Sequence, residues 1–257
     1  MNPQRNSRLN HGQPHIEVRQ LSKVYPNGFR GLDNINVSIG RGEFVAVIGS
    51  SGAGKSTFIR SINRLVQPTA GSVWINGQNT TIARGGDLRR LRLDVAMIFQ
   101  QFNLIKRMTV LRNVLLGRLG YKHGLESLYP IFGSKDVDLA LGCLQRLGIV
   151  EKAYIRADQL SGGQQQRVAI ARALAQEPGV MLADEPVASL DPETSIVVLD
   201  ILRRINREDG ITTLVNLHQL DLAKEYADRI LGFKGGKLVF DGKPDEVTRE
   251  VYERVYR

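Results

Sequence analysis

The chain has 257 residues, of which 42% are hydrophobic, and a formal net charge of +9. This length and composition suit one large or two small domains with a buried core, and they argue against an intrinsically disordered chain. No apolar run approaches the roughly 20 residues that cross a bilayer, so we expect a soluble protein without membrane segments of its own.

Residues 1–14 are polar and lack the apolar segment of a secretory signal, so we expect a flexible tail ahead of one domain at residues 15–257. The single cysteine, Cys143, lies among leucines at helical spacing, which indicates a small core residue in a reducing compartment. The basic charge favours a polyanionic partner without distinguishing nucleotides, nucleic acid and lipid head groups. Arginines and aspartates are interleaved at residues 84–94, which favours a solvated face, and no nucleic-acid partner is expected.

Short strands are predicted at residues 16–18, 35–39, 44–48 and 73–75. The first two alternate apolar and polar residues, as antiparallel edge strands do, whereas the third is apolar throughout, like a strand buried on both faces. From about residue 101 to residue 176 the apolar spacing becomes helical, which predicts an inserted helical subdomain. A strand at 180–183, a helix at 196–205 and a strand at 211–217 follow, with a last strand at 237–240. This order predicts an α/β fold with a parallel sheet.

Four of the apolar runs are followed by chemically distinctive residues: Gly49, Gln100, Asp184 and His218. In open α/β sheets, ligands bind outside the carboxyl ends of the strands. Each residue alone has an ordinary explanation, for example Gln100 as a polar strand end and His218 as a hydrogen-bonded loop histidine. Their common position predicts one shared site.

A phosphate-binding loop is predicted at residues 49–57, GSSGAGKST, between an apolar strand and a helix that ends at Pro68. Its glycines let backbone N–H groups converge on phosphate oxygens, and the helix start adds its positive dipole end. Lys55 is expected to reach the β- and γ-phosphates, and the Ser56 hydroxyl to bind Mg²⁺.

The acidic pair Asp184 and Glu185 follows an apolar strand. Two adjacent acids need two roles, so we expect Asp184 to serve the Mg²⁺ ion and Glu185 to polarise the attacking water as a general base. A pair of surface acids is the alternative, but such pairs seldom follow four apolar residues at a strand end.

A second anion-binding turn is predicted at residues 160–167, LSGGQQQR. Ser161 and Gln164 have the spacing of a capping box, which is sufficient to explain why a helix starts here. It does not explain Gly162 and Gly163, because glycines in the first turn cost stability unless the backbone approaches another group closely. This helix start has no phosphate motif of its own, so its nucleotide must come from elsewhere.

Together these motifs resemble the ATP-binding subunits of ATP-binding cassette transporters over residues 16–242, and the segment at 160–164 is the most specific match. The resemblance implies a P-loop NTPase core of the ABC type, with an antiparallel β subdomain and an inserted α-helical subdomain, that binds ATP and Mg²⁺. It makes residues 49–57 the Walker A loop and Asp184 the Walker B aspartate, and it assigns catalysis to Glu185, His218 and Gln100. Mg²⁺ is then expected at Ser56, Gln100 and Asp184. The residues expected to contact the nucleotide are Tyr25, Gly49, Ser50, Ser51, Gly52, Ala53, Gly54, Lys55, Ser56, Thr57, Ser161, Gly162, Gly163, Gln164 and Asp191.

Tyr25 occupies the position at which the family stacks an aromatic ring on adenine. Phe29 is the alternative, because residues 26–28, Pro-Asn-Gly, can shift the loop. The resemblance also explains the second turn. Two such subunits pack head to tail, and the helix that starts in residues 160–167 of each, the signature helix, covers the ATP bound by the other. A second copy of the chain is therefore an expected partner.

Several segments are similar to the ATP-binding subunits of phosphonate importers: FQQFNL at 99–104, NVLLGRLG at 113–120, ADEPVASLD at 183–191 and the insertion at 121–136. This similarity implies a peripheral subunit on the cytoplasmic face of the cell inner membrane, bound to permease subunits and served indirectly by a solute-binding protein. Phosphite, phosphate and other small oxyanions stay open as solutes, because this subunit never touches the solute.

A soluble cassette ATPase that acts in phosphonate breakdown, repair or translation, without a permease, is the other hypothesis. The two hypotheses differ in the surface they require. A groove beside the segment at 101–115, able to seat a permease helix, would favour the importer.

Overall fold

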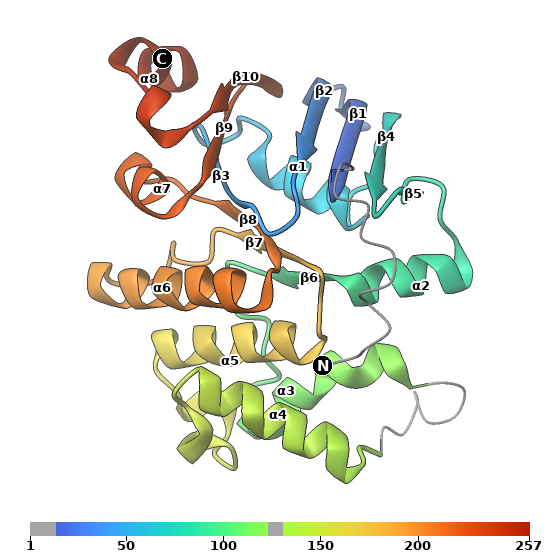
Figure 1. Ribbon diagram of the computed structural model, residues 1–257, viewed down its shortest axis with the longest axis vertical. Helices are drawn as coiled ribbons and strands as arrows, with labels where there is room; N and C mark the ends of the chain where they lie inside the picture. The colour runs from blue at the N-terminus through green and yellow to red at the C-terminus, as the bar shows by residue number, and fades with distance from the viewer. Residues whose placement is uncertain (1–13, 123–130) are drawn as a thin grey trace.

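Two β-sheets organise the computed structural model, which describes residues 14–122 and 131–257 (Figure 1). The larger sheet has the strand order β10-β9-β3-β8-β7-β6, in which β10 alone is antiparallel to its neighbour. Its strands are β3 (Phe44–Ile48), β6 (Val95–Ile98), β7 (Val180–Asp184), β8 (Thr212–Asn216), β9 (Arg229–Lys234) and β10 (Lys237–Gly242). The parallel sheet predicted from the apolar runs is therefore confirmed.

The smaller sheet is antiparallel throughout, with the order β2-β1-β4-β5. Its strands are β1 (Ile16–Val24), β2 (Arg30–Ile39), β4 (Ala70–Ile75) and β5 (Gln78–Asn79). Buried and exposed residues alternate from Ile35 to Ile39, as expected for a strand with one solvated face. The sequence prediction of antiparallel strands here is correct.

Helix α1 (Lys55–Ile62) lies against both sheets. Phe58, Ile59 and Ile62 are fully buried, in one cluster with Val45 and Val47 of β3 and with residues of the smaller sheet. Because α1 begins directly after the loop that follows β3, this packing fixes the helix start at the carboxyl end of the large sheet.

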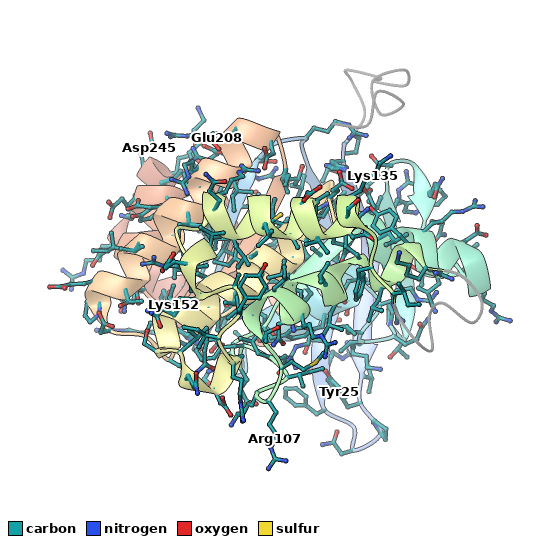
Figure 2. All side chains as sticks on the ribbon, turned by 90° about the horizontal axis from the view of Figure 1, so that it is seen from below. Tyr25, Arg107, Lys135, Lys152, Glu208 and Asp245 are labelled. Atoms are coloured by element: carbon teal, nitrogen blue, oxygen red, sulfur yellow. The ribbon has the colours of Figure 1, made fainter. Side chains whose placement is uncertain are left out.

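The other face of the large sheet is covered by helices (Figure 1). These are α5 (Gly162–Ala175), α6 (Pro192–Asp209), α7 (Leu220–Tyr226) and α8 (Arg249–Tyr256), while α3 (Val110–Leu115) and α4 (Ser134–Arg146) pack on α5. Helix α2 (Gly85–Asp94) has no buried residue, and short 3₁₀ segments lie at η2 (Leu116–Tyr121), η4 (Val150–Lys152), η5 (Ala157–Gln159) and η6 (Pro244–Glu246). In the view from below, Arg107 projects away from this layer, whereas Glu208 of α6 pairs with Arg146 of α4 (Figure 2).

Within the described residues, no helix combines the length and apolar composition needed to cross a membrane. The flexible tail predicted for residues 1–14 falls almost wholly outside the described residues. The helical subdomain predicted for residues 101–176 contains α3, α4 and α5, and its exact limits stay a prediction.

Candidate functional site

The loop between β3 and α1 has a backbone that only glycine tolerates at two points. Gly49 has φ 145° and Gly54 has φ 104°. A Cβ atom at Gly49 would overlap the Phe233 carbonyl oxygen, and one at Gly54 would overlap the Gly31 carbonyl oxygen. The loop thus leads directly into the amino-terminal end of α1, where free N–H groups and the helix dipole favour an anion.

Lys55, the first residue of α1, folds back over this loop. Its side chain is buried and its Nζ donates hydrogen bonds to the carbonyl oxygens of Gly49 and Ser50, at 2.8 and 3.0 Å. Burial lowers the pKa of Lys55, and the nearby carboxylates of Glu185 and Asp184 oppose that shift. The ammonium group is held where a phosphate would bind.

Ser56 and Asp184 meet beside the loop. Asp184 ends β7 with only 1% of its surface exposed, and its Oδ1 accepts a hydrogen bond of 2.7 Å from Ser56 Oγ. In this arrangement the Ser56 hydrogen points to the carboxylate, so a lone pair of Ser56 Oγ stays available for a cation. A hydroxyl and a carboxylate are the oxygen ligands that Mg²⁺ prefers.

Glu185 and His218 come together from neighbouring strands. Glu185 follows β7 in a left-handed conformation, with φ 56°, and its Oε1 lies 2.8 Å from His218 Nε2. At this distance the two groups form an ion pair when the imidazole is protonated. A non-glycine residue at this φ is strained, and such strain is most common at functional sites.

The loop borders a cleft of about 190 Å³, which Glu185 and Phe29 also line. Phe29 is half exposed there. Tyr25 lies beside it, with ring centroids 6.1 Å apart, but its hydroxyl is 3.1 Å from Thr57 Oγ1 and the residue is not part of the cleft wall. This placement favours the alternative, Phe29, as the aromatic residue facing a base.

Three predicted site elements lie away from this cleft. Gln100 is exposed just beyond β6, which is three strands from β3, and it is not part of the cleft wall. Asp191 caps α6 by accepting hydrogen bonds from the Thr194 side chain and backbone, and these bonds lower the pKa of Asp191. Ser161 is also exposed, at the start of α5. The cleft of one chain therefore contains only part of the predicted set.

The capping box predicted for α5 is confirmed. Ser161 Oγ accepts from the Gln164 N–H, and Gln164 Oε1 accepts from the Ser161 N–H. The two glycines differ: a Cβ at Gly163 would overlap the Thr194 side chain of α6, whereas Gly162 has room for one. Packing between α5 and α6 thus explains Gly163, and Gly162 stays unexplained within a single chain.

Two residues of the site were missed in the sequence. Arg60 Nε and Nη2 lie 2.8 and 2.7 Å from Asp184 Oδ2, and Asn216 Nδ2 lies 2.9 Å from Asp184 Oδ1. Arg60 lies one helical turn after Ser56, a spacing that places two side chains on the same face. Asn216 is a polar residue between the apolar residues Val215 and Leu217, two positions before His218, and that contrast was the available clue.

Comparison with known families agrees with this geometry. The family model for ABC transporters matches residues 32–188. The chain is 58% identical over 241 residues, 94% of each protein, to a phosphonates import ATP-binding protein, PhnC, of Bacillus cereus. The chain belongs to the ABC transporter family. A second relative with the same name, from Shouchella clausii, is 59% identical over 94% of this chain and 91% of its own length.

Solved structures of ABC cassettes share the fold. The cassette MJ0796, in a dimeric post-hydrolysis state bound to ADP and Pi, superposes with a TM-score of 0.78 at 38% identity, covering 89% of this chain and 98% of its own. The cassette cbiO1 of Clostridium perfringens, part of the transporter complex cbiONQ, gives a TM-score of 0.81 at 29% identity, covering 95% and 94%. This ABC cassette is thus an ATP-binding ATPase domain with an antiparallel sheet and a helical layer.

Proposed function

We propose that this ABC cassette hydrolyses ATP to energise an importer of phosphonates or a related small oxyanion. The observation that carries the proposal is the cleft lined by Lys55, Ser56 and Glu185, with Asp184 buried behind Ser56. The chain is also similar along nearly its whole length to phosphonate import subunits. The residues of the cleft support ATP hydrolysis, and the names of the relatives support the class of solute.

Mg²⁺ is proposed to bind with ATP at Ser56 and Asp184, and Gln100 is proposed to join them when the site closes. Within the described part of the chain, no three His, Cys, Asp or Glu side chains form a metal site by themselves. That fits an ion whose remaining ligands are water and nucleotide phosphates. Bound there, the ion would neutralise charge on the β- and γ-phosphates.

Hydrolysis is proposed to use Glu185 as the general base, with His218 as its close neighbour. Lys55 and the loop N–H groups hold the phosphates in line with the attacking water. Because all of these groups lie at the ends of β3, β7 and β8, the parallel sheet positions them rigidly.

We further propose that two copies form a head-to-tail dimer, in which Ser161, Gly162, Gly163, Gln164 and Asp191 of one copy complete the site of the other. These residues are absent from the cleft wall of their own chain. Gly162 has no crowding neighbour in its own chain, which suits a close approach by a group from outside. ATP binding would then close the dimer, and hydrolysis would reopen it.

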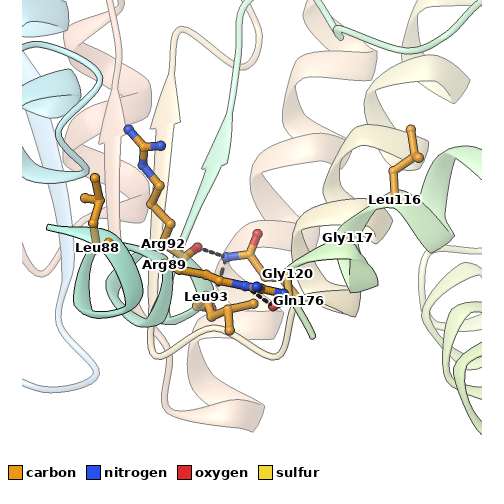
Figure 3. A pocket seen from close by; sticks show the side chains of 9 residues that line it. Leu88, Arg89, Arg92, Leu93, Leu116, Gly117, Gly120 and Gln176 are labelled. Carbon is orange, nitrogen blue, oxygen red and sulfur yellow. Dashed lines mark hydrogen bonds between the residues drawn. The ribbon is translucent and has the colours of Figure 1, made fainter. Parts of the chain in front are cut away.

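A permease segment is proposed to dock in the hollow between α2, η2 and the end of α5, at the cytoplasmic face of the membrane. The hollow measures about 340 Å³, and its wall includes Leu88, Arg92, Leu116 and Gly117 (Figure 3). Gln176 ties the elements together by donating to the carbonyl oxygens of Arg92 and Leu93 (Figure 3). The segment at 101–115, expected to form this groove, contributes no residue to its wall, although Leu116 and Gly117 follow that segment directly. Apolar and arginine side chains together suit a helix that carries a carboxylate.

Docking is tested by co-purification of the permease with two matched variants of α2. Arg92→Glu reverses a charge in the wall of the hollow, whereas Arg90→Glu reverses an exposed charge on the same helix outside it. We expect Arg92→Glu to lose the permease while keeping ATP affinity, and Arg90→Glu to retain both. Association with soluble enzymes only, and with no membrane protein, would favour the accessory ATPase instead.

The solute is tested by uptake in the source organism. Cells that lack this gene should lose uptake of a phosphonate, and the wild-type gene should restore it where Glu185→Gln does not. Parallel uptake of phosphite and phosphate distinguishes the candidate oxyanions. Unchanged uptake of all three solutes would reject the importer proposal.

A further inference from the structure

Asn216 lies at the centre of the site, although no motif includes it. It is the last residue of β8, and it pairs in register with Val47 of β3 on one side and Asp184 of β7 on the other. Its side chain is fully buried. The residue therefore sits between the strand that leads into the phosphate loop and the strand that carries the carboxylate.

The Asn216 amide joins the two oxygens expected to serve the metal. Nδ2 lies 2.9 Å from Asp184 Oδ1 and 3.3 Å from Ser56 Oγ. The amide orientation is fixed by chemistry, because an ionised carboxylate only accepts hydrogen bonds and must face the NH₂ group. Arg60 meanwhile occupies the other oxygen of Asp184.

The hydrogen bonds leave one acceptor position on Ser56 for a further group. Its hydroxyl hydrogen goes to Asp184, and one lone pair faces the Asn216 NH₂ group. A hydroxyl oxygen has two lone pairs, so one remains for a cation. Asn216 thus holds the Ser56 oxygen in a single orientation.

The other end of the amide lacks a partner. Asn216 Oδ1 is buried and has no hydrogen-bond partner among the described residues. Leaving a buried acceptor unsatisfied is costly, so a donor is expected there in the working protein. Water molecules bound to Mg²⁺ are strong donors, and this ion usually keeps several of them.

We propose that Asn216 is a positioning residue for the Mg²⁺–nucleotide site, holding Ser56 and Asp184 through Nδ2 and receiving a donor that arrives with the ion at Oδ1. This inference rests on the proposed Mg²⁺ dependence. Groups that orient metal ligands typically contribute about 10- to 100-fold to metal affinity. The effect should therefore appear in Mg²⁺ affinity rather than in nucleotide affinity without metal.

The test is a Mg²⁺ titration of fluorescent ATP binding by the full chain, with EDTA samples as the metal-free reference. Asn216→Val removes both polar ends of the amide, and Asn216→Thr gives a side chain of the same shape as valine with a hydroxyl that can still donate to Asp184. We expect the Mg²⁺ concentration at half-maximal binding to rise about tenfold in the Val variant. The Thr variant should need clearly less Mg²⁺ than the Val variant, and metal-free affinity should stay within about twofold of wild type for both.

Asn206→Val provides the matched control. Asn206 is another buried asparagine, whose Nδ2 donates to the carbonyl oxygens of Gly42 and Ile211, away from the cleft. It should lower the free energy of unfolding without changing the Mg²⁺ requirement. A wild-type Mg²⁺ requirement in folded Asn216→Val, or a loss of metal-free and Mg²⁺-dependent binding by the same factor, would overturn the proposal. A wild-type chain whose binding ignores Mg²⁺ would instead reject the proposed cofactor.

Discussion

His218 Nε2 lies 2.8 Å from Glu185 Oε1, although 33 positions separate the two residues in the chain. The contact exists because β7 and β8 are parallel neighbours, so that the residues after both strands emerge at the same edge of the sheet. The contact holds the carboxylate on the side of the cleft, where Glu185 forms part of the wall. If Glu185 is the general base, as proposed, a carboxylate held in this way needs no rearrangement before it meets a water molecule.

Glu185→Gln is expected to abolish most ATP hydrolysis while preserving ATP affinity. Glutamine keeps the shape and can still bond His218, but it cannot take a proton, and the loss of a general base typically costs about 10²- to 10⁴-fold in rate. The checks are phosphate release and fluorescent ATP binding, together with size-exclusion chromatography for an ATP-trapped dimer.

Glu250→Gln is the control for this substitution, because Glu250 is an exposed acid in the first turn of α8. It should leave hydrolysis and binding unchanged. Near-normal hydrolysis by folded Glu185→Gln would contradict the assigned role of the carboxylate.

The shared site predicts complementation between two inactive variants. Ser161→Arg keeps the phosphate loop and should bind ATP as a monomer, whereas Lys55→Ala keeps the start of α5 but loses the ammonium group of the loop. A mixed dimer has one complete site, formed by the loop of the first variant and the signature helix of the second. Random pairing places about a quarter of all sites in this state.

ATP retained by the isolated dimer fraction measures this complementation. Each variant alone should retain little nucleotide, and the equimolar mixture should retain clearly more than the sum of the two. Retention equal to that sum would mean that Ser161 does not act on the ATP of a partner.

Gly163→Ala is expected to lower the free energy of unfolding by about 1–3 kcal/mol, because the new methyl group overlaps Thr194 at a packed contact. Gly162→Ala should be neutral or stabilising by about 0.5–1 kcal/mol, since that position has room and alanine favours the helix. Thr194→Ser removes the overlapping methyl group but keeps a hydroxyl for Asp191. The double variant Gly163→Ala/Thr194→Ser should therefore recover part of the stability lost in Gly163→Ala. Urea denaturation of wild type, the three single variants and the double variant measures the coupling. Equal effects at both glycines would refute the packing explanation.

The sequence allows candidate site residues to be predicted where polar side chains directly follow an apolar strand. Apolar runs ending at Gly49, Asp184 and His218 predicted one site, and the parallel sheet brings their neighbours together. The role of Asn216 depends on lateral register between three strands, and the constraint on Gly163 depends on a contact with Thr194 of another helix. Such long-range neighbours are not encoded in local spacing, so a single sequence gives no direct measure of them. The opposite holds for Gln100: the sequence motif predicts it as a site residue, but it is not part of the cleft wall.

Cys143 is expected to report unfolding and to make stability fall at alkaline pH. Burial in α4 raises the pKa of the Cys143 thiol from 9.0 to about 11, so the reactive thiolate is scarce in the native chain at about pH 8. An aromatic disulfide reagent should therefore label the native protein far more slowly than the protein in guanidinium chloride.

Between about pH 9 and pH 11 the unfolded chain releases the Cys143 thiol proton while the folded chain keeps it, so the free energy of unfolding should fall over that range. Cys143→Ala removes this contribution, and the difference between wild type and variant isolates it from other titrating groups. Rapid labelling of the native protein at about pH 8 would show that the thiol is not held in a buried, neutral state. The same conclusion would follow if the free energy of unfolding had the same pH dependence in both proteins.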